Sequence, residues 1–211
     1  MVIKRIDYGM FEEIIYLNPS FSEKKNKIRI SLYLDPNMSK WNRNIPYVLF
    51  SAYELLPDCK DHNCSFNHYS VEDSSHQMKE RDINEIPLII EHIILGVINQ
   101  VGNIDNANGL TCVSKTNEYL YSIFVECDDP CLGEFAVFAA KNLVEDILIH
   151  GDRSPLWDFI LNSAKHLYPS SYDQLPAKKL KWEFGWSKDQ IEMVIRTLKS
   201  LSFFHPQGGI A

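Results

Sequence analysis

Hydrophobic and polar positions divide the chain into strand-like and helix-like segments. Apolar and polar residues alternate along residues 28–35 (IRISLYLD), which predicts a strand with one buried face. Residues 110–113 and 119–126 predict two further strands, joined by a short polar link as in a hairpin. The short apolar runs 2–7 and 10–17, on either side of a turn at a glycine, also predict strands.

The most apolar segment is residues 85–102, EIPLIIEHIILGVINQVG. Its apolar side chains would cover almost the whole circumference of a helix, which predicts a buried helix. Glu91 and His92 interrupt it in the middle. Because burying an unpaired polar group costs about 1–3 kcal/mol, and an unpaired charge costs more, we expect this pair to have partners or to line a cleft.

Helical periodicity and capping residues predict the remaining elements. Pro46 opens one helical pattern, and Ser154 and Ser187 are candidate N-caps near the C-terminus. We therefore expect an α+β fold with a mixed or antiparallel sheet, packed by a buried central helix and two further helices, with a C-terminal helical appendage. The expected parts are a sheet from residues 2–17, 28–35 and 110–126, helices 46–56, 85–101 and 133–149, a domain over residues 1–150, and a helical extension over residues 151–211.

Composition narrows the classes of partner. The 211 residues are 45% hydrophobic and 23% charged, which is typical of a globular chain. The net charge of −7 argues against a nucleic-acid partner, which needs a basic face. The N-terminus lacks the pattern of a signal peptide, and Glu91-His92 interrupts the only candidate span, so we expect a cytoplasmic chain without a membrane partner. Neither a phosphate-binding P-loop nor a G-x-G-x-x-G motif occurs, so no nucleotide cofactor is expected.

Three blocks of sequence carry a resemblance to a known family. They are YELLPDCKDHNCS at residues 53–65, LIIEH at residues 88–92 with the apolar helix after it, and residues 126–143 from Glu126 through GEFAVFAAKNL. Together and in this order they resemble the N-terminal domain of cyanophycin synthetase, over roughly residues 1–150. That enzyme polymerises aspartate and arginine, and this domain is associated with holding the polymer and, in some members, with cutting it. The resemblance implies a stand-alone binding or scaffold module for a peptide or an Asp/Arg polymer, since the ATP-using domains do not follow.

The resemblance also implies a site. The family pattern is similar to the inverted zinc motif His-x-x-Glu-His, which assigns Glu91 as the catalytic base and His92 and Glu126 as metal ligands. Leu88 occupies the position of the first histidine and cannot bind a metal. Two protein ligands are too few for a catalytic zinc site, which favours a degenerate site that binds rather than cleaves. The alternative is a metal-dependent, peptidase-like hydrolase with zinc as cofactor and an altered ligand set, drawn from His62, His68 or His76.

Two further segments leave alternatives open. Cys59, His62, Cys64 and His68 could close a structural zinc site or lie in a loop held by local hydrogen bonds. Residues 178–186 combine lysines with aromatic residues, a pattern that hints at nucleic acid but more often consists of core aromatics beside solvated lysines. A homo-oligomer, or a partner docked on the C-terminal helices, stays open.

Overall fold

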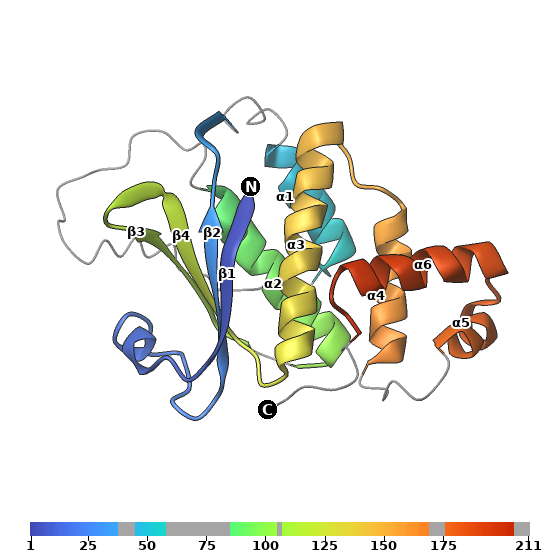
Figure 1. Ribbon diagram of the computed structural model, residues 1–211, viewed down its shortest axis with the longest axis horizontal. Helices are drawn as coiled ribbons and strands as arrows, with labels where there is room; N and C mark the ends of the chain where they lie inside the picture. Colours follow the sequence, from blue (N-terminus) through green and yellow to red (C-terminus); the bar gives the residue numbers. More distant parts are fainter. Residues whose placement is uncertain (38–44, 58–84, 105–106, 169–175, 205–211) are drawn as a thin grey trace.

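The computed structural model describes residues 1–37, 45–57, 85–104, 107–168 and 176–204. In these ranges the chain forms an antiparallel sheet with helices packed beside it (Figure 1), which confirms the predicted α+β class. The elements are β1 (Val2–Gly9), the 3-10 helix η1 (Glu12–Tyr16), β2 (Lys27–Tyr33), α1 (Ile45–Leu55), α2 (Glu85–Gly102), β3 (Gly109–Ser114), β4 (Asn117–Glu126), α3 (Pro130–His150), α4 (Leu156–Leu167), α5 (Pro176–Phe184) and α6 (Lys188–Ser200).

The described strands form one sheet in the order β1-β2-β4-β3, with every pair antiparallel. β4 is central, and Val125 on β4 lies opposite both Ile28 on β2 and Gly109 on β3. Side chains alternate between the two faces of a strand, so paired residues share a face. Ile28, Ile123 and Val125 therefore point to the face that the helices cover, where all are buried.

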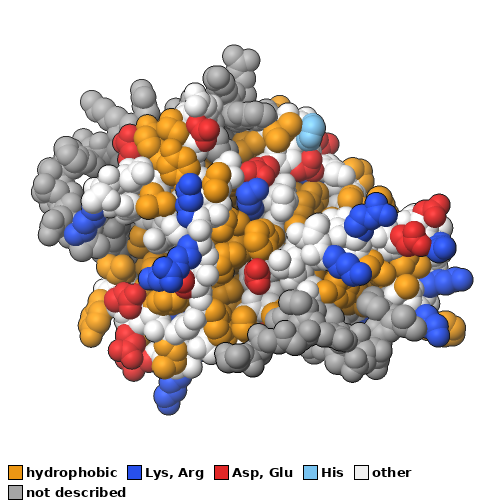
Figure 2. Space-filling model, in the orientation of Figure 1, with side chains coloured by type: hydrophobic (Ala, Val, Ile, Leu, Met, Phe, Trp, Pro, Cys, Tyr) orange, Lys and Arg blue, Asp and Glu red, His pale blue; other side chains and the backbone are white. Residues whose placement is uncertain are grey.

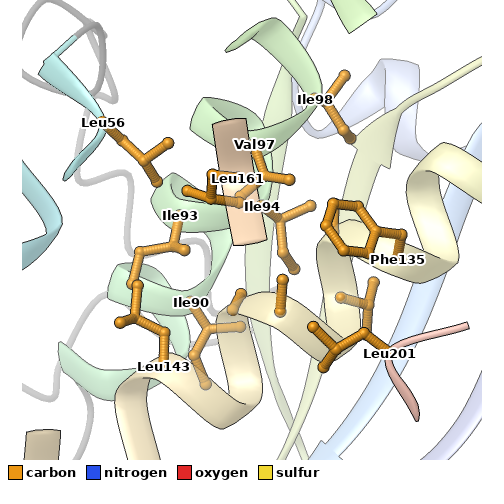
Figure 3. Close-up of a cluster of buried hydrophobic side chains, with 14 of the residues drawn as sticks. Leu56, Ile90, Ile93, Ile94, Val97, Ile98, Phe135, Leu143, Leu161 and Leu201 are labelled. Atoms are coloured by element: carbon orange, nitrogen blue, oxygen red, sulfur yellow. The ribbon is translucent and has the colours of Figure 1, made fainter. Parts of the chain in front are cut away.

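The helix α2 is the centre of the core. Figure 3 shows its isoleucines and valine packed against Phe135 and Leu143 of α3 and Leu161 of α4. By length and composition α2 could cross a membrane, but 67% of that window is buried inside the fold. The apolar circumference that predicted a buried helix is thus explained by neighbours on several sides.

The opposite face of the sheet carries a smaller cluster. Ile14 of η1 packs with Phe21, Leu110 and Phe124. The prediction of a strand at residues 10–17 is wrong, because a 3-10 turn forms here. Adjacent Glu12-Glu13 and Ile14-Ile15 pairs do not alternate between two faces, whereas a short helical turn buries Ile14 and leaves both glutamates in solvent.

The C-terminal helices extend the same core. Trp157, Ile160 and Leu161 of α4, with Leu198 of α6, belong to one continuous buried cluster with α2 and α3. The Ser187 cap of α6 is confirmed, with its hydroxyl accepting from the Gln190 backbone. The helix α5 is not predicted by the sequence analysis, and α3 begins at Pro130 rather than at residue 133, capped by the Asp129 carboxylate.

Candidate functional site

Glu91 extends from α2 toward the edge strand β3. Its side chain is buried, at 1% exposed, and its Oε2 accepts a hydrogen bond from the Thr111 hydroxyl. A Cβ atom added to Gly109 would lie 2.5 Å from Glu91 Oε1. The absence of a side chain at Gly109 is therefore what lets β3 pass so close to the carboxyl group.

Burial sets the electrostatics of this site. It raises the pKa of Glu91 from 4.5 to about 7, while the Thr111 hydrogen bond acts in the opposite direction. Burial, and then the nearby Glu91 charge, raises the pKa of the Cys112 thiol to about 11. At neutral pH the carboxyl group lies close to half-protonation and can accept or donate a proton, whereas the thiol stays protonated and is a weak nucleophile.

Alternate residues of the edge strand β3 direct their backbone hydrogen-bonding groups away from β4. The Glu126 N–H donates to the Asn108 carbonyl at 2.9 Å, which fixes which residues bond to β4. Hydrogen-bonded and non-bonded pairs alternate along an antiparallel ladder. Gly109, Thr111 and Val113 therefore direct their N–H and C=O groups toward the outer edge, where no other strand of the described chain pairs.

Glu126 does not join Glu91. It follows Val125, which points to the helices, so its side chain lies on the opposite face of the sheet. There its carboxylate accepts the Ser22 backbone N–H at 2.5 Å and the Asn108 side-chain amide at 2.9 Å. The Lys25 ammonium lies 3.8 Å away. The expected shared pocket of Glu91, His92 and Glu126 is therefore wrong, since the sheet separates the two carboxylates.

His92 is half-buried, and its side chain diverges from that of Glu91 by about 100° around α2. Within the described residues no three histidine, cysteine, aspartate or glutamate side chains gather as a metal site. The substitute donors His62, His68 and His76, and the cluster that includes Cys59 and Cys64, lie outside the described residues.

Lys27 is a site residue that the sequence analysis missed. It is buried opposite Glu126 in the β2–β4 register, and its ammonium donates to the carbonyls of Ser22 and Lys25 at 2.6 and 2.7 Å. Together with Glu126 it fastens the segment before β2 to the sheet. The alternating pattern of β2 places Lys27 on the polar face with Arg29, so it reveals neither the burial of Lys27 nor the carbonyl groups that receive its ammonium.

The pair Cys127 and Cys131 has a structural role here. The Cys127 thiol donates to the Asp129 carbonyl at 3.0 Å, and burial raises the pKa of this thiol to about 12. The Asp129 carboxylate accepts the Cys131 and Leu132 backbone N–H groups and the Tyr168 hydroxyl. These contacts fix the start of α3.

No protein-family model and no curated protein matches the chain.

Proposed function

We propose that this chain is a cytoplasmic binding module for extended, arginine-bearing peptides, with the edge strand β3 and the buried Glu91 carboxyl group as its site. One observation carries the proposal: an ionisable carboxyl group lies directly beneath an edge strand whose outward backbone groups no other described strand uses. The motif resemblance to the cyanophycin synthetase N-terminal domain agrees with the ligand class.

The edge strand supplies the affinity for a main chain. An extended peptide added beside β3 would accept hydrogen bonds from the N–H groups of Gly109, Thr111 and Val113 and donate to their C=O groups, as in strand-addition complexes. Val113 is largely exposed at this edge, so its side chain does not hinder approach.

Charge supplies the preference for arginine. Residues 1–150 contain 13 Lys and Arg residues and 22 Asp and Glu residues, a formal charge of −9. A guanidinium group that reaches Glu91 would stabilise the ionised carboxylate, which burial alone disfavours. Thr111, whose hydroxyl donates to this carboxyl group, must then release its hydrogen bond or share the carboxylate.

The alternative, a zinc-dependent hydrolase, receives less support. The sheet removes Glu126 from the predicted ligand set, and Leu88 removes the first histidine. What remains from the predicted motif is Glu91 with His92, one base and one ligand, whereas a catalytic zinc site uses three protein ligands.

A binding titration tests the proposal. A fluorescent Asp/Arg polymer fragment is titrated with the wild-type chain, with Glu91→Gln, and with Glu134→Gln, which alters an exposed carboxylate on α3. We expect binding by the wild type and the control, weaker binding by Glu91→Gln, and none to polyaspartate without arginine. Absence of binding by the wild type would overturn the proposal. Cleavage of the polymer together with stoichiometric zinc in the purified protein would establish the hydrolase instead.

A further inference from the structure

The last three described helices form a compact unit around a short turn. Each of α4, α5 and α6 contacts the other two, and only residues 185–187 separate α5 from α6. Gly185 adopts a φ of +64°, and its N–H donates to the Lys181 carbonyl at 3.0 Å, which closes α5. The capping box of Ser187 and Gln190 then begins α6 at once. A three-residue, glycine-containing turn between two helices matches the connection of a helix-turn-helix.

Packing within the unit fixes which face of α6 points outward. Leu180 of α5 and Ile191, Val194 and Leu198 of α6 are buried. The Trp186 ring in the turn stacks on Phe184, with centroids 4.4 Å apart, and meets the Phe159 ring of α4 edge-on at 5.1 Å. The inner faces are thus occupied, and the helix pair is held in one orientation.

The outward face carries polar groups that can bind base edges. Lys188, Gln190, Met193 and Arg196 are exposed on α6, with Asp189 and Glu192 among them. The Lys188 side chain is 87% exposed, and its ammonium forms a 3.6 Å surface ion pair with Glu192. Amide, guanidinium, ammonium and carboxylate groups are those that discriminate base pairs in the major groove.

Charge separates this unit from the rest of the chain. Residues 176–200 contain six Lys and Arg residues and three Asp and Glu residues, whereas residues 1–150 carry a charge of −9. Figure 2 shows several blue side chains at the end of the molecule where α5 and α6 lie, with red side chains beside them, and further blue side chains over the rest of this face. On α5, Trp182 is 88% exposed beside the solvated Lys178 and Lys181. The net charge of the chain, which argued against a nucleic-acid partner, is thus the sum of an acidic region, residues 1–150, and a basic one, residues 176–200.

We propose that α5 and α6 are a DNA-binding helix-turn-helix, with α6 in the major groove of a duplex and the α5 lysines on its phosphates. In this motif the first helix crosses the backbone and the second presents its N-terminal residues to the bases. In the N-terminal half of α6, Lys188, Gln190 and Met193 are exposed, while Ile191 and Val194 hold this half against the core. This activity is independent of peptide binding at β3.

Fluorescence anisotropy with a labelled, random-sequence DNA duplex tests the proposal on the full chain, at about 50 and 200 mM salt. The double variant Lys178→Glu/Lys181→Glu reverses two exposed α5 charges, and Lys4→Glu/Lys24→Glu makes the same charge change on the exposed surface of the body. We expect the α5 variant alone to bind DNA at least about tenfold more weakly. The slope of its log binding constant against log salt concentration should be smaller in magnitude by about two.

Three results would overturn the proposal: no duplex binding by the wild type at low salt, equal losses in the two double variants, or binding to anionic phosphatidylserine vesicles but not to DNA. Preferred DNA sequences can be selected with the wild-type chain. The variant Arg196→Ala should then lose more affinity for the selected sequence than for the random pool. Polymer binding measured on the α5 variant separates the two proposals, since it should be unchanged there, while Glu91→Gln should retain DNA binding.

Discussion

Replacing Glu91 with glutamine should change how stability depends on pH. Burial raises the pKa of this group from 4.5 to about 7, so the folded state binds its proton more tightly than the unfolded state does. Stability is therefore greatest below about pH 4.5 and is lost as the pH rises toward 7, where the carboxylate forms in the core. The shift corresponds to about 3 kcal/mol, at about 1.4 kcal/mol per pKa unit.

Glutamine keeps an oxygen that can accept the Thr111 hydroxyl but cannot ionise. We expect Glu91→Gln to have a free energy of unfolding close to that of the wild type at pH 5, and to be more stable by up to about 3 kcal/mol at pH 8. Urea unfolding at pH 5, 6, 7 and 8 would measure the difference.

Subtraction of the two curves isolates Glu91, since every other ionisable group is common to both proteins. Glu134→Gln, which removes an exposed carboxylate from α3, is the matched control variant. A pH-independent difference for Glu91→Gln would refute the reasoning, because it would mean that this carboxyl group titrates alike in the folded and unfolded chains.

Further predictions concern close contacts. Gly109→Ala should destabilise the fold by about 1–3 kcal/mol, and most of that cost should vanish in a Glu91→Ala background, as a double-mutant cycle from thermal melts would show. Glu126→Ala should lower the free energy of unfolding by about 1–3 kcal/mol, because the half-buried Ser22 N–H and Asn108 amide lose this acceptor, without changing zinc content measured by plasma mass spectrometry. Gly133→Ala should cost at least about 1–3 kcal/mol in denaturant unfolding, because its methyl group would overlap Ile28; unchanged stability would contradict this packing.

Elements with strong periodicity could be predicted from the sequence. The alternation in β2 and the apolar circumference of α2 both give the correct secondary structure and burial. By contrast, α5 has nine residues, several of them lysine, and packs against α4 before it and α6 after it, with Leu180 buried. A short helix whose stability comes from such tertiary contacts leaves little local signal.

The candidate site was predictable only in part. Glu91 stands out because a charged residue interrupts an apolar helix, and its burial is confirmed. Its contacts with Gly109 and Thr111 depend on how α2 meets β3, which no local pattern specifies. The error about Glu126 was avoidable, since Ile123 and Val125 mark the helix-facing side of β4 and the next residue must face away.

The buried cluster that runs without interruption from the sheet through α2 to α6 has a consequence for both proposed activities. Removing residues 151–211 would remove Trp157 and Leu161 from the buried cluster that includes α2. The apolar surface exposed in this way would promote aggregation, so neither fragment is expected to be soluble. Melting should accordingly follow a single cooperative transition in calorimetry. A ligand bound at either proposed site should therefore raise the melting temperature of the whole domain. Occupancy of one site can then be detected as stabilisation of the helices and strands around the other.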